Sequence, residues 1–245
     1  LLDLDMLERN IATMAAHAKK AGINLRPHSK GAKSIEIARR QVAAGAIGIC
    51  CATLGEAEAL AAGGIENLLI TSPVVTPAMI DRLLALNGRS RVLLVVADNP
   101  DNVEALAQAG AATGQPLALV VEFDVGQGRT GTTSVEAAAA LARRIKSSAH
   151  LRYAGIQAYY GHLQHIAAHA DRKAAAAAQM ARVKALLDHL KAEDLAPAIV
   201  TGGGTGTFDI DPDGHVYTEV QAGSYPFMDR EYLEIAMTAG GNSPF

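Results

Sequence analysis

Short apolar runs alternate along this chain with longer segments in which hydrophobic residues recur every three or four positions. The first pattern is typical of strands and the second of amphipathic helices. The apolar runs predict strands at Asn24–Ser29, Ile47–Thr53, Asn67–Ser72, Arg91–Ala97, Leu117–Asp124, Leu151–Tyr159, Ala198–Gly202 and Tyr217–Ala222. The periodic segments predict helices at Leu4–Ala21, Ile35–Ala44, Leu54–Ala62, Pro77–Leu86, Pro100–Gln108, Ser134–Lys146 and Asp171–Lys191.

Strands that alternate with helices indicate βαβ units and a parallel sheet. Most of the runs are apolar at consecutive positions, as expected for strands that are covered on both faces. Eight strands with intervening helices in 245 residues match a (β/α)8 TIM barrel, which typically needs about 250 residues. We therefore predict an α/β protein built around one such barrel.

Composition narrows the class of partner. The 22 basic and 25 acidic residues are scattered, so no basic surface for nucleic acid is indicated. No apolar run approaches the roughly 18 residues of a membrane span. Cys50 and Cys51 are adjacent and are the only cysteines, which excludes a disulfide framework and indicates a reducing cytoplasm. We expect a small-molecule ligand, and neither nucleic acid nor a membrane as partner.

Unusual polar residues follow the predicted strands. The loops read HSKGAK, TLGEAE, VGQGRTG, YYGHLQH, GGGTGTF and GSYPFMD after the first, second, fifth, sixth, seventh and eighth strands. The carboxyl ends of all barrel strands lie at one rim, where the active sites of such enzymes are built. The sequence therefore predicts a functional site at this rim.

The loops after the last two strands favour an anion. TGGGTGTF, at 201–208, contains four glycines, and QAGSY follows at 221–225. Glycines let backbone N–H groups approach an anion closely, and barrels often bind phosphate at these two loops. A plain glycine-rich turn is the alternative. The chain has neither a GxxxxGK[ST] nor a GxGxxG signature in the required place, so a small phosphorylated cofactor fits better than a nucleotide.

Lys30 follows the first strand at the same rim, with Arg26, His28 and Lys33 nearby. Desolvation or neighbouring cations lower the pKa of a lysine and make it a Schiff-base nucleophile. A single loop lysine is usually solvated. A Schiff-base lysine facing a phosphate loop is, however, the combination that pyridoxal 5'-phosphate requires.

Six blocks of the sequence together carry a family resemblance: RPHSK, CATLGEAE, VGQGRTG, IQAYYGHLQH, TGGGTGTF and EVQAGSYPFMD. They resemble the D-threonine aldolase family, whose relatives are 3-hydroxy-D-aspartate aldolases and metal-dependent D-serine dehydratases. The resemblance implies the alanine-racemase-like barrel of fold type III pyridoxal-phosphate enzymes over residues 1–235. We expect residues 236–245 to begin a connection to a C-terminal β-domain that lies outside this sequence.

The resemblance also implies roles for individual residues. Lys30 is the lysine that carries the cofactor, although Gly31 and Ala32 replace a Thr-His pair that many members have after it. Arg129 reaches the 3'-oxygen of the cofactor, and Thr53 lines the pocket unless it is simply packed. The phosphate cradle is formed by Gly203, Gly204, Thr205, Gly223, Ser224 and Tyr225.

The partner of the cofactor's ring nitrogen comes from strand eight in this fold, where the sequence offers Gln221, and Tyr160 could also approach. Neither is a carboxylate. Since an aspartate at this position deepens the electron sink in other pyridoxal-phosphate folds, we infer a weaker sink here.

His162, His165 and His169 have the spacing of one helix face, which a solvated surface explains as well as a metal does. We predict no metal ligand within this chain. The resemblance implies a divalent ion, manganese, magnesium or similar, held by residues of the C-terminal domain. His165 is instead expected in the pocket, where it takes or relays the proton of the substrate hydroxyl.

The predicted activity is that of a cytoplasmic, homodimeric lyase that cleaves 3-hydroxy-D-amino acids to glycine and an aldehyde. The substrate amine replaces Lys30 on the cofactor, and His165 or a hydroxide on the divalent ion removes the β-hydroxyl proton. One alternative is a D-serine or 3-hydroxyaspartate dehydratase. A non-catalytic pyridoxal-phosphate barrel, or a barrel that binds a phosphorylated sugar with Lys30 as an anion contact, are others.

Overall fold

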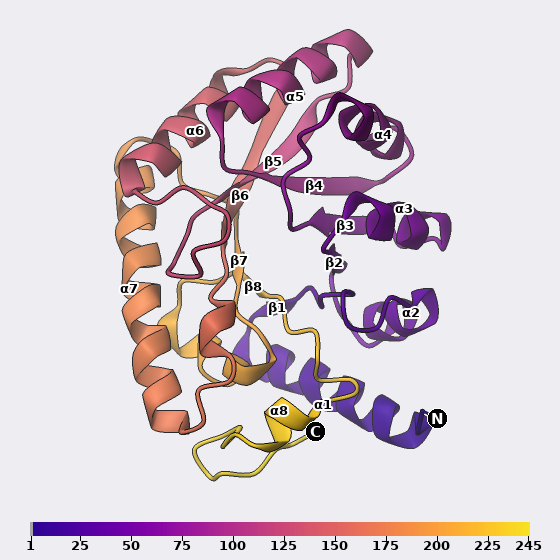
Figure 1. Ribbon diagram of the computed structural model, residues 1–245, viewed down its shortest axis with the longest axis vertical. Helices are drawn as coiled ribbons and strands as arrows, with labels where there is room; N and C mark the ends of the chain where they lie inside the picture. Colours follow the sequence, from indigo (N-terminus) through magenta and orange to yellow (C-terminus); the bar gives the residue numbers. More distant parts are fainter. Residues whose placement is uncertain (1) are drawn as a thin grey trace.

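Eight parallel strands form one curled sheet in the computed structural model, which describes residues 2–245 (Figure 1). The sheet order is β1-β8-β7-β6-β5-β4-β3-β2. The strands are β1 (Asn24–Leu25), β2 (Ile49–Cys51), β3 (Asn67–Ile70), β4 (Val92–Ala97), β5 (Leu117–Glu122), β6 (Leu151–Ala158), β7 (Ile199–Gly202) and β8 (Glu219–Val220). The predicted (β/α)8 barrel is confirmed.

Backbone hydrogen bonds beyond the regular ladders close the sheet between β1 and β2. Ile47 N–H donates to Leu25 C=O at 2.9 Å, and Cys50 N–H donates to Pro27 C=O at 2.8 Å. Pro27 has no N–H to donate in return, so the pairing is interrupted there. This interruption explains why β1 is much shorter than the predicted Asn24–Ser29, although an isolated bridge joins His28 to Cys50.

Helices surround the strands on the outside (Figure 1). They are α1 (Leu4–Ala21), α2 (Ile35–Ala43), α3 (Leu54–Ala62), α4 (Pro77–Asn87), α5 (Pro100–Thr113), α6 (Val135–Ser147), α7 (His169–Ala192) and α8 (Arg230–Leu233). Side-chain oxygens cap most of the long helices, and Thr53, for example, accepts from Glu56 N–H at the start of α3. None of these helices, within residues 2–245, is both long and apolar enough to cross a membrane.

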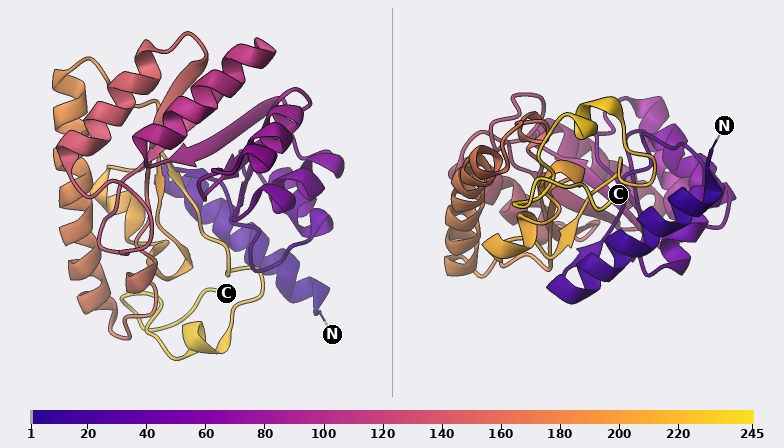
Figure 2. Two further views of the ribbon diagram at one scale, coloured as in Figure 1. Left: turned by 45° about the horizontal axis from the view of Figure 1, so that its top comes forward. Right: turned by 90° about the horizontal axis from the view of Figure 1, so that it is seen from below.

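The helix that covers β8 is α1, from the N-terminal end of the chain. Only the four-residue α8 follows β8, and α1 instead packs across β1 and β8 (Figure 2). Leu7, Ile11 and Met14 of α1 share one buried apolar cluster with Leu25 and Val220. The segment after β8 packs back onto the same region, because Met237 belongs to this cluster and Phe245 lies edge-on to Phe208 at 5.1 Å.

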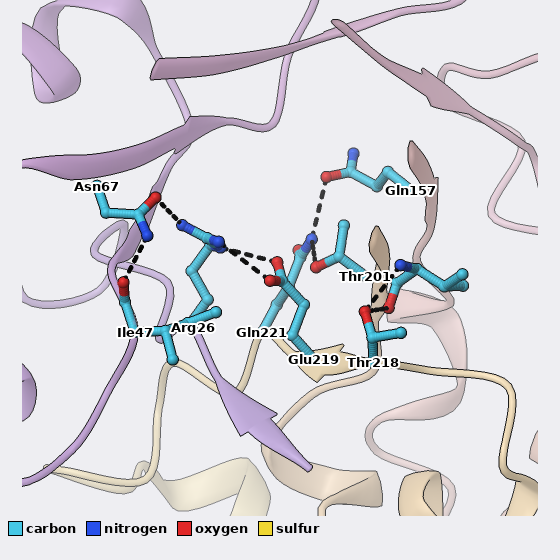
Figure 3. A network of polar contacts seen from close by, with 9 residues as sticks. Arg26, Ile47, Asn67, Gln157, Thr201, Thr218, Glu219 and Gln221 are labelled. Atoms are coloured by element: carbon cyan, nitrogen blue, oxygen red, sulfur yellow. Dashed lines mark hydrogen bonds and ion pairs between the residues drawn. The ribbon is translucent and has the colours of Figure 1, made fainter. Parts of the chain in front are cut away.

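A buried ion pair crosses the barrel interior between the first and last strands (Figure 3). Arg26 Nε lies 2.7 Å from Glu219 Oε1, and Arg26 Nη2 lies 3.0 Å from Oε2, so the contact is bidentate. Arg26 Nη1 also donates to Asn67 Oδ1 at 2.7 Å, and Asn67 Nδ2 donates to Ile47 C=O. The pair therefore ties β1 to β8, while Asn67 extends the link to β3 and to the residues before β2.

Removing one partner of this pair should destabilise the fold strongly, because the other charge would stay buried without compensation. We expect Arg26→Met to lower the free energy of unfolding by about 3–5 kcal/mol. The double variant Arg26→Met, Glu219→Leu should recover much of that loss. Urea unfolding measures the free energy of unfolding of both variants. Equal losses in the single and the double variant would show that the uncompensated charge is not the source of the destabilisation.

Candidate active site

A cavity of about 180 Å³ opens at the carboxyl ends of the strands. Loops after β1, β6, β7 and β8 supply its walls. The lining residues are His28, Lys30, Gly31, Tyr159, Gly161, Gln164, His165, Gly204, Thr205, Gln221, Gly223, Ser224, Asp229 and Tyr232. The rim predicted to be functional is thus hollowed at four of the six predicted loops, and the loops after β2 and β5 supply no lining residue.

A larger cavity of about 390 Å³ lies at the opposite end of the barrel, beside Ile47, Asn67 and Val92 at the amino ends of the strands. Its wall carries only two ionisable side chains, Glu66 and Arg91, which are exposed and pair loosely with each other at 3.5 Å. Since barrel enzymes place their chemistry at the carboxyl ends of the strands, the smaller cavity is the candidate site.

Lys30 and Arg129 share one aromatic ring at the cavity. Lys30 Nζ lies 5.3 Å from the centroid of the Tyr159 ring, and Arg129 Cζ lies 5.9 Å from it. Burial of the ammonium, followed by the charge of Arg129, lowers the pKa of Lys30. Lys33 does not line the cavity and turns toward Glu56, with Nζ 3.6 Å from Oε1. Lys30 is therefore the lysine that faces the cavity with the properties of a nucleophile.

His28 holds the backbone at Lys30 as a neutral ring. Lys30 N–H lies 3.2 Å from Nδ1, so Nδ1 accepts and the proton sits on Nε2, which donates to Thr71 Oγ1 at 3.0 Å. The Thr71 hydroxyl donates onward to Cys51 C=O. Burial, then the charges of Lys30 and Arg129, lower the pKa of His28 to about 3. Both ring nitrogens are engaged, so His28 positions Lys30 and does not serve as a base.

The side chain of Gln221 presents its oxygen, a hydrogen-bond acceptor, to the cavity. The side-chain nitrogen of Gln157 donates to Thr71 C=O at 3.4 Å and to Glu122 Oε1 at 3.1 Å. Because the Thr71 carbonyl can only accept, the atom of Gln157 that faces it must be the nitrogen. Gln157 Oε1 therefore faces Gln221 and accepts from its Nε2 at 3.1 Å (Figure 3). The second Nε2 hydrogen of Gln221 goes to Thr201 Oγ1 at 2.9 Å. Both amide hydrogens are used, which leaves Gln221 Oε1 for a ligand.

Only some residues of the glycine loop after β7 line the cavity. Gly204 and Thr205 line it, whereas Gly203 stands behind them with φ +65°. Gly204 N–H donates to Asp211 Oδ2 at 3.2 Å, on the side away from the cavity. The sequence predicted that Gly203 and Gly204 contribute to an anion cradle. Their backbone amides do not, because the Gly204 N–H is already bound to Asp211 and Gly203 does not line the cavity.

The loops after β7 and β8 are joined through Thr205. Its Oγ1 accepts from Ser224 N–H at 3.0 Å and from Tyr225 N–H at 3.2 Å. Gly223 lies against β1, and a Cβ there would come within 2.8 Å of His28 C=O. Tyr225 does not line the cavity, because its ring is fully buried and its hydroxyl accepts from Gln41 Nε2 at 3.0 Å.

Two further predicted residues lie outside the cavity wall. Thr53 is exposed and caps α3, so it does not line the pocket. Tyr160 is fully buried on the outer side of the sheet, where it donates to Asp211 Oδ1 and packs on Tyr217 at 6.0 Å. Successive strand residues point to opposite faces, so Gln157 and Tyr159 share the inner face and Tyr160 points outward. Tyr160 therefore does not reach a ligand in this cavity.

The three histidines after β6 do not converge. His165 lines the cavity and packs on the Tyr232 ring at 4.5 Å. His169 Nε2 instead lies 2.9 Å from Asp209 Oδ2, and His162 lies near Gly126 on another loop. The three histidines therefore have different neighbours, and among the described residues they do not form one group with the spacing of a metal site.

His165 has acidic neighbours instead. One ligand atom from each of His165, Asp229 and Glu231 lies within 4.8 Å of the others, and all three residues are exposed. Asp229 Oδ1 already accepts from Tyr232 N–H at the start of α8, and Glu231 Oε2 lies 3.4 Å from His165 Nε2. Within residues 2–245 this is the single group with the spacing of a metal site, and two of its side chains already make other contacts, a helix cap by Asp229 and the approach of Glu231 to His165.

The sequence predictions did not include Tyr232 and Gln164 in the pocket, or Asp211 behind it. Tyr232 followed the last recognised block, and no periodic pattern marked it. Gln164 donates to Thr207 Oγ1 at 3.0 Å and accepts from Gly206 N–H at 2.8 Å, so it holds the glycine loop. Its place inside the YYGHLQH loop was the only available signal.

Comparison of the sequence with known protein families identifies the family of this chain. The alanine racemase N-terminal domain matches residues 2–231, and the chain belongs to this family. The barrel is accordingly of the alanine-racemase N-terminal type, as predicted.

Comparison with individual proteins gives more specific similarities. A 3-hydroxy-D-aspartate aldolase of Paracoccus denitrificans (strain Pd 1222) is 42% identical over 96% of this chain and 61% of its own. A D-threonine aldolase of an Arthrobacter species is 41% identical over 95% and 61%. The crystal structure of D-threonine aldolase from Filomicrobium marinum aligns with a TM-score of 0.94 and 37% identity, over 96% of this chain and 63% of its own. The chain thus spans about three fifths of the length of these relatives.

The charge of Arg129 should control the reactivity of Lys30. Because the guanidinium lowers the pKa of Lys30, Arg129→Gln should raise that pKa and reduce the unprotonated fraction of the amine near neutral pH. Acetic anhydride labelling, followed by peptide mass spectrometry, should then modify Lys30 more slowly. Lys33 is the internal control and Arg152→Gln, an exposed arginine on β6, the control variant. An unchanged rate at Lys30 would contradict this account.

Proposed function

We propose that this barrel binds pyridoxal 5'-phosphate and belongs to a lyase that cleaves 3-hydroxy-D-amino acids to glycine and an aldehyde. The observation that carries the proposal is Lys30, an amine of lowered pKa that faces the loops after β7 and β8 across one small cavity. The names of the Paracoccus and Arthrobacter relatives support the choice of reaction.

The residues around the cavity fit this cofactor. Lys30 offers the amine for attachment, and Gln221 Oε1 offers an acceptor for the ring N–H. Thr205, Gly223 and Ser224 form a concave wall for the phosphate. A side chain at Gly223 would fill that wall or press on His28, which explains a glycine there. Arg129, exposed beside the Tyr159 ring, is proposed to contact the 3'-oxygen.

Bound in this way, the cofactor supplies an electron sink for the pair of electrons left at the substrate Cα. Gln221 is a neutral acceptor, so it holds a proton on the ring nitrogen less firmly than a carboxylate would. This matches the weaker sink inferred from the sequence. A weaker sink suits the cleavage of a bond whose leaving group, an aldehyde, is stable by itself.

His165 is the proposed acceptor of the substrate hydroxyl proton. It lines the cavity, and its Nε2 lies 3.4 Å from Glu231 Oε2. The other candidates are less suitable. His28 has both nitrogens bound, and burial raises the pKa of the Tyr159 hydroxyl, which keeps that group protonated.

Further parts of the assignment are proposals from the resemblance. The divalent ion, manganese or magnesium or a similar metal, is proposed to bind through residues outside this chain, next to the substrate hydroxyl. A homodimer and a cytoplasmic location are proposed on the same basis.

Cofactor attachment tests the first half of this proposal. Borohydride reduction of the protein with pyridoxal 5'-phosphate, followed by peptide mass analysis, should find the label on Lys30. Lys30→Ala should abolish labelling, whereas Lys33→Ala should leave it intact because Lys33 turns toward Glu56. A label on Lys33 in the wild-type protein would refute the assignment.

Product analysis tests the second half. Incubation of the full-length protein with cofactor, divalent ion and D-threonine should yield glycine and acetaldehyde. His165→Gln should slow this cleavage by about 10²–10⁴-fold, the usual contribution of a general base. His162→Gln, on a neighbouring position outside the cavity, should leave the rate nearly unchanged. Ammonia and 2-oxobutanoate without glycine would identify a dehydratase instead.

A further inference from the structure

A buried carboxylate stands directly behind the glycine loop of the cavity. Asp211 begins a short 3-10 helix (Asp211–Gly214) and is completely buried. Three donors surround it: the Tyr160 hydroxyl contacts Oδ1, while the Thr207 hydroxyl at 2.8 Å and Gly204 N–H at 3.2 Å contact Oδ2. Two of these donors belong to the loop that shapes the cavity.

The loop is built around this carboxylate. Gly203 adopts φ +65°, and a Cβ on it would lie 2.1 Å from Asp211 Oδ2. Glycine at position 203 is therefore required by the close approach of Asp211 as well as by the left-handed backbone, whereas a Cβ at Gly204 would lie 2.5 Å from Gln164 Oε1. Gly204 N–H is turned back to Asp211 and Gly206 N–H is held by Gln164, so the loop lines the cavity through Thr205 and the remaining backbone of Gly204.

Thr205 in turn fixes the loop after β8. Its Oγ1 accepts from Ser224 and Tyr225 N–H, so a shift of the first loop displaces the second. Both walls of the proposed phosphate position therefore depend on how the loop is held from behind.

We propose that Asp211 is a positioning residue that holds the loop of residues 203–207 in the shape required to bind the phosphate of the cofactor. The inference rests on the proposed function, because it concerns the phosphate of pyridoxal 5'-phosphate. Burial raises the pKa of Asp211 to about 7, against the opposing effect of its hydrogen bonds. Burying this carboxyl group costs free energy, which its hydrogen bonds from Tyr160, Thr207 and Gly204 offset.

The test compares two ligands that differ only in the phosphate. Apo-protein is titrated with pyridoxal 5'-phosphate and with pyridoxal, and attachment to Lys30 is followed by absorbance. In Asp211→Leu the affinity for pyridoxal 5'-phosphate should fall by about tenfold or more, as expected when buried donors lose their hydrogen-bond acceptor. The affinity for pyridoxal, which has no phosphate, should change by less than about twofold.

Two further variants keep the test decisive. Asp211→Asn should bind pyridoxal 5'-phosphate nearly as well as the wild type, because its carbonyl can face the loop while its amide donates to the Tyr160 oxygen. Thr207→Val removes the hydroxyl between loop and carboxylate, and it should reproduce the phosphate-specific loss even if Asp211→Leu does not fold. Asp213→Leu, an exposed residue that pairs with Lys173 at 2.8 Å, is the matched control and should behave as wild type.

Each result then has one meaning. Equal losses of affinity for both ligands in Asp211→Leu or Thr207→Val, or no loss for either, would overturn the positioning role while leaving the proposed function intact. A wild-type protein that attaches neither ligand at Lys30 would overturn the proposed function, and this inference with it.

Discussion

The bidentate contact between Arg26 and Glu219 determines how the two ends of the barrel meet. It joins β1 to β8 in the interior, where an unpaired charge would be costly. Side chains along a strand alternate, so the inner face that holds Arg26 also holds His28, and the one that holds Glu219 also holds Gln221. The register set by this ion pair thus brings Lys30, just beyond β1, opposite the loop that follows β8.

Neutral polar groups above the ion pair give the site its polarity. His28, Gln157 and Gln221 are held by carbonyl oxygens and hydroxyls that leave each only one orientation. Consequently the cavity has a fixed acceptor at Gln221 and a cation at Lys30, with the exposed Arg129 near the Tyr159 ring of its wall. The wall opposite Lys30 is formed by loops braced from behind by Asp211 and Gln164. Gln157 and Asp211, which do not line the cavity, therefore fix groups that do.

The sequence predicted the barrel well, because apolar runs and helical periods report burial directly. The bounds of α1 and α3 agreed to the residue, and Lys30, Gln221 and His165 were correctly placed at the cavity. Thr53 and Tyr160 were misplaced: a threonine before a helix serves equally as a cap, and one residue along a strand reverses the face. Asp211 and Tyr232 were not foreseen, since their positions depend on loop contacts between segments far apart in the chain.

We propose that the meeting of the first and last strands creates one site for a phosphorylated cofactor at Lys30. A crystal structure of the protein grown with pyridoxal 5'-phosphate would show whether it does. We expect continuous density from Lys30 Nζ to the cofactor, with the ring nitrogen at Gln221 Oε1 and the phosphate between Thr205 and Ser224. A cofactor bound to another lysine, or a phosphate held at the opposite end of the barrel, would contradict it.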